Sequence, residues 1–237
     1  EMAFASQEDV FAVLERVLPP IFAKYGKYHT ASQAPFTRIP YLEAMDKYGS
    51  DKPDLRIDLT LTDATDLLAG CGFPPFEHQT MKAIVVTGFQ GTRKQIDGIC
   101  NEVEVQSGEK AYWFRYDENR EIVGGIAKFV QPIKEQAVEA LGLTPGCFVG
   151  LTAGPLLNAQ KTAGVLRNKL GAFCPNHMDK ERYEFCWIVD FPMYEIGEES
   201  GELEFCHNPF SMPNGGAEIL EKAIRGEVDP LSITAFQ

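Results

Sequence analysis

The run KAIVVTGF at residues 82–89 decides the fold of the middle of this chain, because it is apolar and rich in β-branched residues and therefore predicts a buried strand. Residues 92–106 predict a helix directly after it. The segment AYWFRY at 111–116 predicts the next strand, and residues 122–130 predict a weaker one. Two strands joined through a helix indicate a layered domain of helices and sheet.

The alternation of helices and strands continues along the chain. Pro132 opens another predicted helix, which Gly142 closes. Residues 146–152 predict a strand, and a helix is expected over 156–170, ended by Gly171. These elements together are long enough to close an α+β core of their own.

The N-terminal flank has a different pattern. Residues 6–25 predict a helix that Ser6 and Asp9 cap, and Pro19-Pro20 should kink or end this helix. A second, short helix is expected over 40–48. A polar loop rich in turn-forming residues follows it.

The C-terminal flank begins with the predicted strand EFCWIVDFPMYE at 184–195 and contains a short helix near 216–225. The order of outer piece, middle domain and outer piece predicts a domain inserted into a loop of another domain. We therefore divide the chain into residues 1–57, 58–184 and 185–237.

The charge balance limits the possible partners. The net charge is −12, which argues against a free-standing binder of DNA or RNA, because attraction to phosphates needs a surplus of Lys and Arg. Charge can still be local, and Arg93-Lys94 and the set Lys161, Arg167 and Lys169 form basic clusters in the sequence.

The length of the apolar runs, the first residues and the spacing of the cysteines predict a cytoplasmic protein. The apolar run at 185–189 is far shorter than the ~20 residues that span a membrane, and residues 1–4 do not begin a secretory signal. The cysteines lack the paired, regular spacing of a disulfide framework or zinc ribbon, so we expect reduced thiols and no metal site. They are found at positions 71, 100, 147, 174, 186 and 206.

Two loops are candidates for chemistry, and each has an ordinary structural explanation. Residues 48–56 place two carboxylates and two cations in a short loop, which a solvated, charge-balanced turn would also explain. Residues 206–210 place a histidine beside an asparagine, where a loop histidine bonded to backbone is the simpler reading. No nucleotide-binding P-loop, G-x-S-x-G or H-E-x-x-H motif occurs, so the sequence shows no complete active site.

Several segments together resemble a known family. They are EMAFASQEDV at 1–10, RIPYLEAMDKYGSDKPDLR at 38–56, TRKQID at 92–97, WIVDFPMYE at 187–195 and HNPFSMP at 207–213. In this order they resemble the bacterial-type aspartate–tRNA ligases over essentially the whole chain.

The resemblance implies a fold for each part of the chain. The flanks 1–57 and 185–237 would be incomplete pieces of a class II synthetase core, an antiparallel sheet flanked by helices. The middle domain, 58–184, would be the bacterial insertion domain, of ferredoxin-like α+β build. A tRNA-dependent amidotransferase subunit shares such a domain, but it would not explain the signatures on both flanks.

The resemblance also implies an activity. Members of the family activate L-aspartate with ATP and Mg²⁺ and transfer it to the 3′ end of its tRNA, and the parent enzyme is expected to be a cytoplasmic homodimer. The α-phosphate gains negative charge in the first step, so cations must stabilise it. Selection of aspartate over asparagine needs groups aimed at the side-chain carboxylate.

Site residues follow from the resemblance position by position. His207 stands where the family's histidine contacts the bound amino acid. Its neighbour is usually a second histidine and is Asn208 here, which keeps a donor and an acceptor but cannot carry a proton. Further residues expected to line the active site are Glu1, Ser50, Asp51 and Lys52.

The resemblance places other parts of the site outside this sequence. The arginine that grips the α-phosphate is expected before Glu1 and the ATP-binding arginine after Gln237. The anticodon-binding domain is likewise expected before Glu1. We therefore expect an internal fragment that is inactive alone and binds no cofactor.

Two other function classes are weighed against this reading. The first is a non-catalytic interaction or structural module, in which the middle domain contacts protein or tRNA. The second is a cysteine or metal enzyme, and its only support in the sequence is a set of scattered Cys and His residues.

Overall fold

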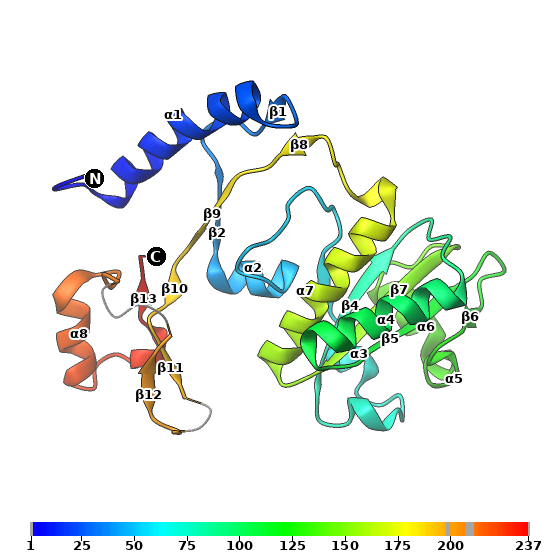
Figure 1. Cartoon of the computed structure of the whole chain (residues 1–237). Helices are drawn as coiled ribbons and strands as arrows, with labels where there is room; N and C mark the ends of the chain where they lie inside the picture. The colour runs from blue at the N-terminus through cyan, green and yellow to red at the C-terminus, as the bar shows by residue number, and fades with distance from the viewer. Residues whose placement is uncertain (1, 198–199, 207–210, 237) are drawn as a thin grey trace. The chain divides into compact units, whose positions relative to one another are not determined.

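The computed structural model describes residues 2–197, 200–206 and 211–236. The chain forms two compact units, one of residues 44–180 and one that combines residues 1–43 with 181–237. Figure 1 shows the elements along the chain. In the sequence, the division between residues 43 and 44 falls within α2 (Tyr41–Tyr48). All six cysteines lie in the described ranges, and none forms a disulfide.

The unit of residues 44–180, here called the middle unit, contains one five-stranded sheet with helices. Its strands are β3 (Leu61–Asp63), β4 (Thr80–Val86), β5 (Ala111–Tyr116), β6 (Ile122–Val123) and β7 (Cys147–Gly154). Its helices are α3 (Thr65–Leu68), α4 (Arg93–Ser107), α5 (Ala127–Val130), α6 (Lys134–Ala140) and α7 (Leu156–Phe173).

The sheet of the middle unit is antiparallel throughout, in the order β3-β4-β7-β5-β6. Strands β4 and β5 both pair with β7, so they run parallel to each other with β7 between them. The helix α4 connects β4 to β5, which makes a split β-α-β unit. The middle unit is therefore an α+β fold, as the sequence predicted, and its sheet is antiparallel.

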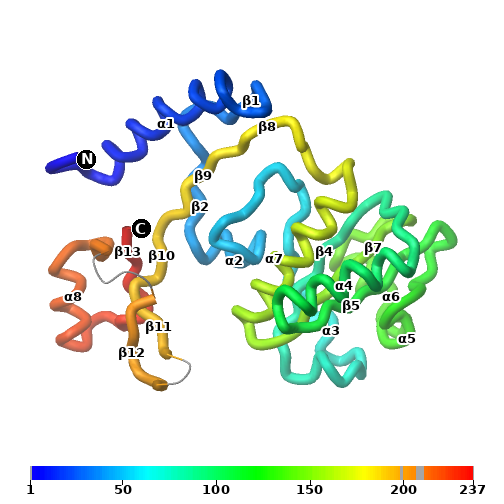
Figure 2. The backbone as a smooth tube through the Cα atoms, viewed as in Figure 1, coloured from blue at the N-terminus to red at the C-terminus, as the bar shows by residue number. Residues whose placement is uncertain are grey.

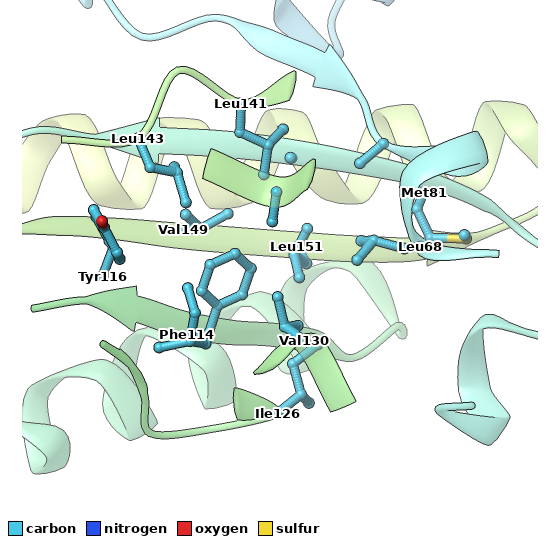
Figure 3. Packing of buried hydrophobic residues seen from close by; sticks show 14 of the residues in the cluster. Leu68, Met81, Phe114, Tyr116, Ile126, Val130, Leu141, Leu143, Val149 and Leu151 are labelled. Carbon is cyan, nitrogen blue, oxygen red and sulfur yellow. The ribbon is translucent and has the colours of Figure 1, made fainter. Parts of the chain in front are cut away.

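Both faces of this sheet are covered by helices. On one face, α4 and α7 bury a cluster that includes Ile84, Phe148 and Leu166. Figure 3 shows the cluster on the other face, to which α3, α5 and α6 contribute, with Phe114 and Leu151 at its centre. Burial of each such side chain stabilises the fold by about 1.5–3 kcal/mol, so the middle unit has a core of its own.

Sequence signals set the ends of α4. Thr92 and Gln95 form a capping box: the Thr92 hydroxyl accepts from the Gln95 amide, and the Gln95 side chain accepts from the Thr92 amide. Gly108 ends the helix at φ 77°, a left-handed conformation that favours glycine.

The unit of residues 1–43 and 181–237, here called the outer unit, holds short strands and two helices. Its helices are α1 (Gln7–Tyr25) and α8 (Gly216–Ile224). Its strands are β1 (Thr30–Ala31), β2 (Thr37–Pro40), β8 (Arg182–Tyr183), β9 (Cys186–Val189), β10 (Phe191–Pro192), β11 (Tyr194–Ile196), β12 (Leu203–Phe205) and β13 (Thr234–Ala235).

The two flanks of the chain pair with each other in the outer unit, as Figure 2 shows for β2 and β9. The pairs β1–β8 and β2–β9 are parallel, whereas β10–β13 and β11–β12 are antiparallel. The core sheet was expected to be antiparallel. Parallel neighbours need a long crossover connection, and the middle unit lies between β2 and β9 in the chain and supplies it.

Helix α1 is fastened to strand β9 by polar and aromatic contacts. The carboxylate of Glu15 accepts hydrogen bonds from the Trp187 indole at 2.8 Å and from the Phe36 amide at 3.0 Å. The rings of Phe11 and Trp187 stack with centroids 4.2 Å apart. Residues distant in the sequence therefore share one packed cluster.

Two helices continue past residues that were expected to kink or end them. Helix α1 continues through Pro19 and Pro20, and the ring of Phe22 beyond them packs against Tyr183 at 4.8 Å. Helix α7 continues past Gly171 to Phe173. Gly171 is required for close packing and not for a helix end, because a Cβ there would lie 2.7 Å from the Ile57 side chain.

The weak strand expected over 122–130 is only partly present. Strand β6 ends at Val123, and residues 127–130 form the helix α5. Gly124 and Gly125 turn the chain at positive φ between them, and a Cβ on Gly125 would lie 1.8 Å from the Trp113 carbonyl oxygen. The strand therefore stops where only glycine fits beneath Trp113.

The segment 44–57, which we placed in the first flank, packs within the middle unit. Lys82 on β4 explains part of this, since its ammonium contacts Asp46 at 2.7 Å and Asp63 at 3.0 Å. The Lys82 side chain is 2% exposed. Burial opposes its charge, but the hydrogen bonds that the ammonium donates to the two carboxylates outweigh this and raise the pKa of Lys82.

Candidate functional site

Three of the six predicted site residues can be placed. Glu1, His207 and Asn208 lie outside the described residues. Ser50, Asp51 and Lys52 follow helix α2 in the loop Tyr48–Arg56, here called the signature loop.

The signature loop begins with a contact between two backbones. Gly49 has φ 66°, and a Cβ on it would lie 2.2 Å from the Gln160 carbonyl oxygen of α7. In the reverse direction, a Cβ on Gly164 would lie 2.2 Å from the Gly49 carbonyl oxygen. Only glycine fits on either side, so the start of the loop rests directly on α7.

The next three residues form a polar turn. The Ser50 hydroxyl accepts a hydrogen bond from the Lys52 amide at 3.0 Å, and the Lys52 ammonium lies 3.7 Å from the Asp51 carboxylate. The Lys52 side chain is 87% exposed. The turn is thus charge-balanced and solvated, and it also presents a cation that can contact a carboxylate or phosphate.

The end of the loop is closed by an ion pair. The Arg56 guanidinium donates to the Asp54 carboxylate through Nε at 2.8 Å and Nη2 at 2.7 Å. The Arg56 amide also donates to Asp54, at 3.1 Å. The hydrogen bonds from the Arg56 side chain hold the pKa of Asp54 below its usual value.

The lowered pKa of Asp54 predicts an acid-sensitive loop. Its ionised form stabilises the folded state above the ordinary pKa of 3.8, and this contribution is lost as the pH falls through the lower folded value. At pH 7 we expect Asp54→Asn to lower the free energy of unfolding by about 1–2 kcal/mol. The difference from wild type should shrink at pH 3, as urea unfolding at both pH values would measure. An equal difference at both would contradict the prediction.

Arg167 on α7 lies beneath the signature loop and is 1% exposed. Its Nε donates to the Leu59 carbonyl at 2.6 Å, and its Nη2 donates to the carbonyls of Ile57 at 2.7 Å and Asp54 at 3.0 Å. Its guanidinium lies 4.9 Å from the centroid of the Tyr48 ring. Burial lowers the pKa of Arg167.

By sequence, Arg167 was grouped with Lys161 and Lys169 as a basic cluster, and this grouping is wrong. Arg167 points into the protein, whereas Lys169 pairs with Glu102 at 2.7 Å. The helical spacing held the signal that could have found this. Gly164 and Leu170, three positions away on either side, are buried and share a face with Arg167.

His177 is a second residue that sequence reasoning missed. Its Nδ1 lies 2.8 Å from the Asp58 carboxylate, and its Nε2 lies 3.0 Å from the Thr87 carbonyl oxygen. It borders a pocket of about 270 Å³ that Gln90 and Asn176 also line. Both ring nitrogens already have partners within the protein, so His177 fastens strand β4 to the segments around it.

Two of the segments that carry the family resemblance, one from each flank, pair as strands in the outer unit. Strands β2 and β9 pair in the register Arg38 to Trp187 and Ile39 to Ile188. The segments at 38–56 and 187–195 therefore begin at paired residues.

Within residues 2–197, 200–206 and 211–236, no group of three or more His, Cys, Asp or Glu side chains could hold a metal ion. Over the same ranges, no helix combines the length and the apolar character that crossing a membrane requires.

Comparison with known proteins places these features in a family. The family model of class II tRNA synthetases (D, K and N) matches residues 1–231. The aspartate–tRNA ligase of Streptomyces avermitilis is 41% identical over 240 residues, which cover 100% of this chain and 40% of the relative. The aspartate–tRNA(Asp/Asn) ligase of Acidiphilium cryptum is 42% identical over 243 residues, with the same coverage. The corresponding ligase of Rickettsia felis is 35% identical, and the chain again spans 40% of its length.

Proposed function

The chain belongs to the class II tRNA synthetases of the D, K and N group, and we propose that the protein carrying it joins L-aspartate to tRNA. The supporting observation is the identity of about 40% to aspartate–tRNA ligases over the whole chain, both flanks included. A purely structural or binding module is not favoured, because the match extends through the flank signatures as well as the middle unit.

The proposed reaction has two steps. An oxygen of the aspartate α-carboxylate attacks the α-phosphorus of ATP, pyrophosphate leaves, and an aspartyl adenylate forms. A terminal hydroxyl of the tRNA then attacks the activated carbonyl carbon, and AMP leaves. Charge develops on the phosphate and carbonyl oxygens, so cations and hydrogen-bond donors must face them.

Mg²⁺ is a proposed cofactor for the first step, alongside ATP. The described residues contain no cluster of carboxylates that would hold it, so we assign it no ligand in these ranges and derive no step through it.

Residue roles in the proposed site follow the family's pattern. His207 would contact the bound aspartate, with Asn208 beside it as a neutral donor and acceptor. Ser50, Asp51, Lys52 and Glu1 would line the site. The exposed ammonium of Lys52 supports this role, since it is available to a carboxylate or phosphate.

The proposed domain assignment is an insertion domain of ferredoxin-like build, residues 58–184, within a class II catalytic sheet formed by 1–57 and 185–237. The split β-α-β unit of β4, α4 and β5 supports the ferredoxin-like build. The pairing of β2 with β9 supports one sheet shared by both flanks.

The proposed partners are tRNA and L-aspartate, with two copies of the protein in a homodimer and the cytoplasm as the compartment. The relatives differ in name: that of S. avermitilis is called aspartate–tRNA ligase, whereas that of A. cryptum is called aspartate–tRNA(Asp/Asn) ligase.

ATP–pyrophosphate exchange with the full-length gene product tests the proposal. We expect exchange that depends on L-aspartate and not on L-asparagine, and charging of an aspartate tRNA transcript. Charging of an asparagine tRNA transcript decides whether the enzyme accepts aspartate tRNA alone or both tRNAs. The 237-residue chain is assayed in parallel, with no turnover expected. Absence of aspartate-dependent exchange in the full-length protein would refute the proposal.

The proposed site is tested by His207→Ala. Loss of a hydrogen bond to a charged substrate is expected to raise KM for aspartate about tenfold or more. The matched control is His29→Ala, because His29 is exposed and its Nδ1 lies 3.1 Å from the carbonyl oxygen of Ala23, which is close in the sequence. Equal KM values in the two variants would exclude His207 from aspartate binding.

A further inference from the structure

We propose that Arg167 is a positioning residue, which holds the signature loop in the shape needed for binding, so that the middle unit sets the geometry of this loop. The inference rests on the proposed function, in which Ser50, Asp51 and Lys52 line the active site.

The contacts of Arg167 are directed at the backbone of the loop and of the segment that follows it. Its three hydrogen bonds end on the carbonyl oxygens of Asp54, Ile57 and Leu59. Its guanidinium also covers the ring of Tyr48, where the loop begins. One buried side chain thus joins the start of the loop to its end. The planar fork of arginine suits this arrangement, because its donors point in fixed directions.

Independent contacts fix the same segment to the middle unit. Gly49 and Gly164 bring the loop and α7 into backbone contact. Asp46, just before the loop, binds the buried ammonium of Lys82. The backbone is therefore held on both sides of the turn, while the side chain of Lys52 extends into solvent. A rigid backbone with an exposed cation is the arrangement expected of a preorganised ligand contact.

This arrangement predicts a link between the middle unit and substrate binding. A substitution at Arg167 does not alter the side chains of Asp51 and Lys52. It does remove hydrogen bonds that hold the loop backbone and the segment after it in position. Small misplacements of binding groups can cost large factors in rate. The expected defect is thus in substrate use, beyond what loss of stability explains.

The test compares Arg167→Gln and Arg167→Lys with Leu170→Ala in the full-length gene product. Leu170 is buried on the same helix, and its apolar side chain has no donor for the carbonyls of the loop, so Leu170→Ala controls for loss of stability. All variants are compared by thermal unfolding first. Hydrogen exchange then follows the amides of Lys52 and Arg56, which bond to Ser50 and Asp54.

We expect exchange of these two amides to accelerate about tenfold or more in Arg167→Gln and less in Arg167→Lys, which keeps the charge and part of the donor set. Leu170→Ala should leave them close to wild type at a comparable loss in Tm. The kcat/KM for aspartate-dependent pyrophosphate exchange should fall about tenfold or more in Arg167→Gln, and Arg167→Lys should restore part of it.

Two results would overturn the inference. One is equal loop exchange in Arg167→Gln and Leu170→Ala, which would make Arg167 an ordinary core residue. The other is faster loop exchange in Arg167→Gln with unchanged kcat/KM, which would separate the loop from catalysis. A wild-type protein without aspartate-dependent exchange would refute the proposed function instead, and the amide exchange rates would still decide whether Arg167 holds the loop.

Discussion

Replacing Gly164 with alanine is expected to lower the free energy of unfolding of the middle unit by about 3 kcal/mol, at the upper end of the usual cost of overpacking. The added Cβ would lie 2.2 Å from the carbonyl oxygen of Gly49 and 2.8 Å from its carbonyl carbon. Both neighbours are backbone atoms, so no side chain can rotate away. Either α7 must shift or the signature loop must lift from it.

The control is the same substitution in another helix. Gly98 lies within α4, and a Cβ there would meet no atom within 4 Å. Gly98→Ala should therefore raise the free energy of unfolding by about 0.5–1 kcal/mol, because alanine is the better helix former. Urea unfolding of both variants measures the contrast. Similar values for the two would show that the backbone contact at Gly164 carries no stability.

The ion pairs around Lys82 predict a large loss of stability when both carboxylates are removed and a much smaller change when the lysine is removed. Lys82 is buried, whereas the side chains of Asp46 and Asp63 are 64% and 55% exposed. Replacing both aspartates with alanine leaves a buried ammonium without a partner, and we expect a loss of about 3–5 kcal/mol. Replacing the lysine in Lys82→Met leaves two carboxylates that water can solvate, so we expect a much smaller change.

Urea unfolding at pH 7 compares Lys82→Met with the double variant Asp46→Ala/Asp63→Ala. The single aspartate variants serve as controls, since each leaves one carboxylate on the ammonium and should fall between wild type and the double variant. A Lys82→Met variant as unstable as the double variant would refute the asymmetry.

Local signals predicted several elements of the fold well. The helix expected over 92–106 is present as α4, and Thr92, Gln95 and Gly108 supply caps that act within a few residues. Strand β5 has the predicted bounds, 111–116. Caps and apolar runs are read from neighbouring residues alone, and the alternation of these elements was sufficient to predict an α+β middle domain.

Features that depend on distant residues were not predicted. Gly171 was read as a helix end, whereas its role is set by Ile57, more than a hundred residues earlier in the chain. Pro19-Pro20 was expected to kink or end the first helix, which continues to Tyr25, and contacts between Phe22 and Tyr183 stabilise the turn beyond the prolines. The resemblance led us to expect both flanks in one sheet, but which strands pair, and in which register, depends on tertiary packing that local propensity does not contain.

Some residues of the candidate site could likewise be predicted from the sequence and others could not. Ser50, Asp51 and Lys52 were found through motif resemblance, and the structure adds their geometry. Arg167 was noticed only for its charge, because its partners are backbone carbonyls, which no side-chain pattern in the sequence reveals. The assignments of His207, Asn208 and Glu1 stay predictions.

The parallel pairing of β2 with β9 implies an order of events during folding. Closing a long unstructured loop to bring these strands together costs entropy that grows with its length. The middle unit shortens that path, because Ile57 pairs with Met178 and the Asp179 amide bonds to the Arg56 carbonyl at 2.9 Å, which brings its entering and leaving segments together. The middle unit should therefore fold early and the flanks should pair late, so mutations that slow its collapse would also delay the joining of the chain's two ends.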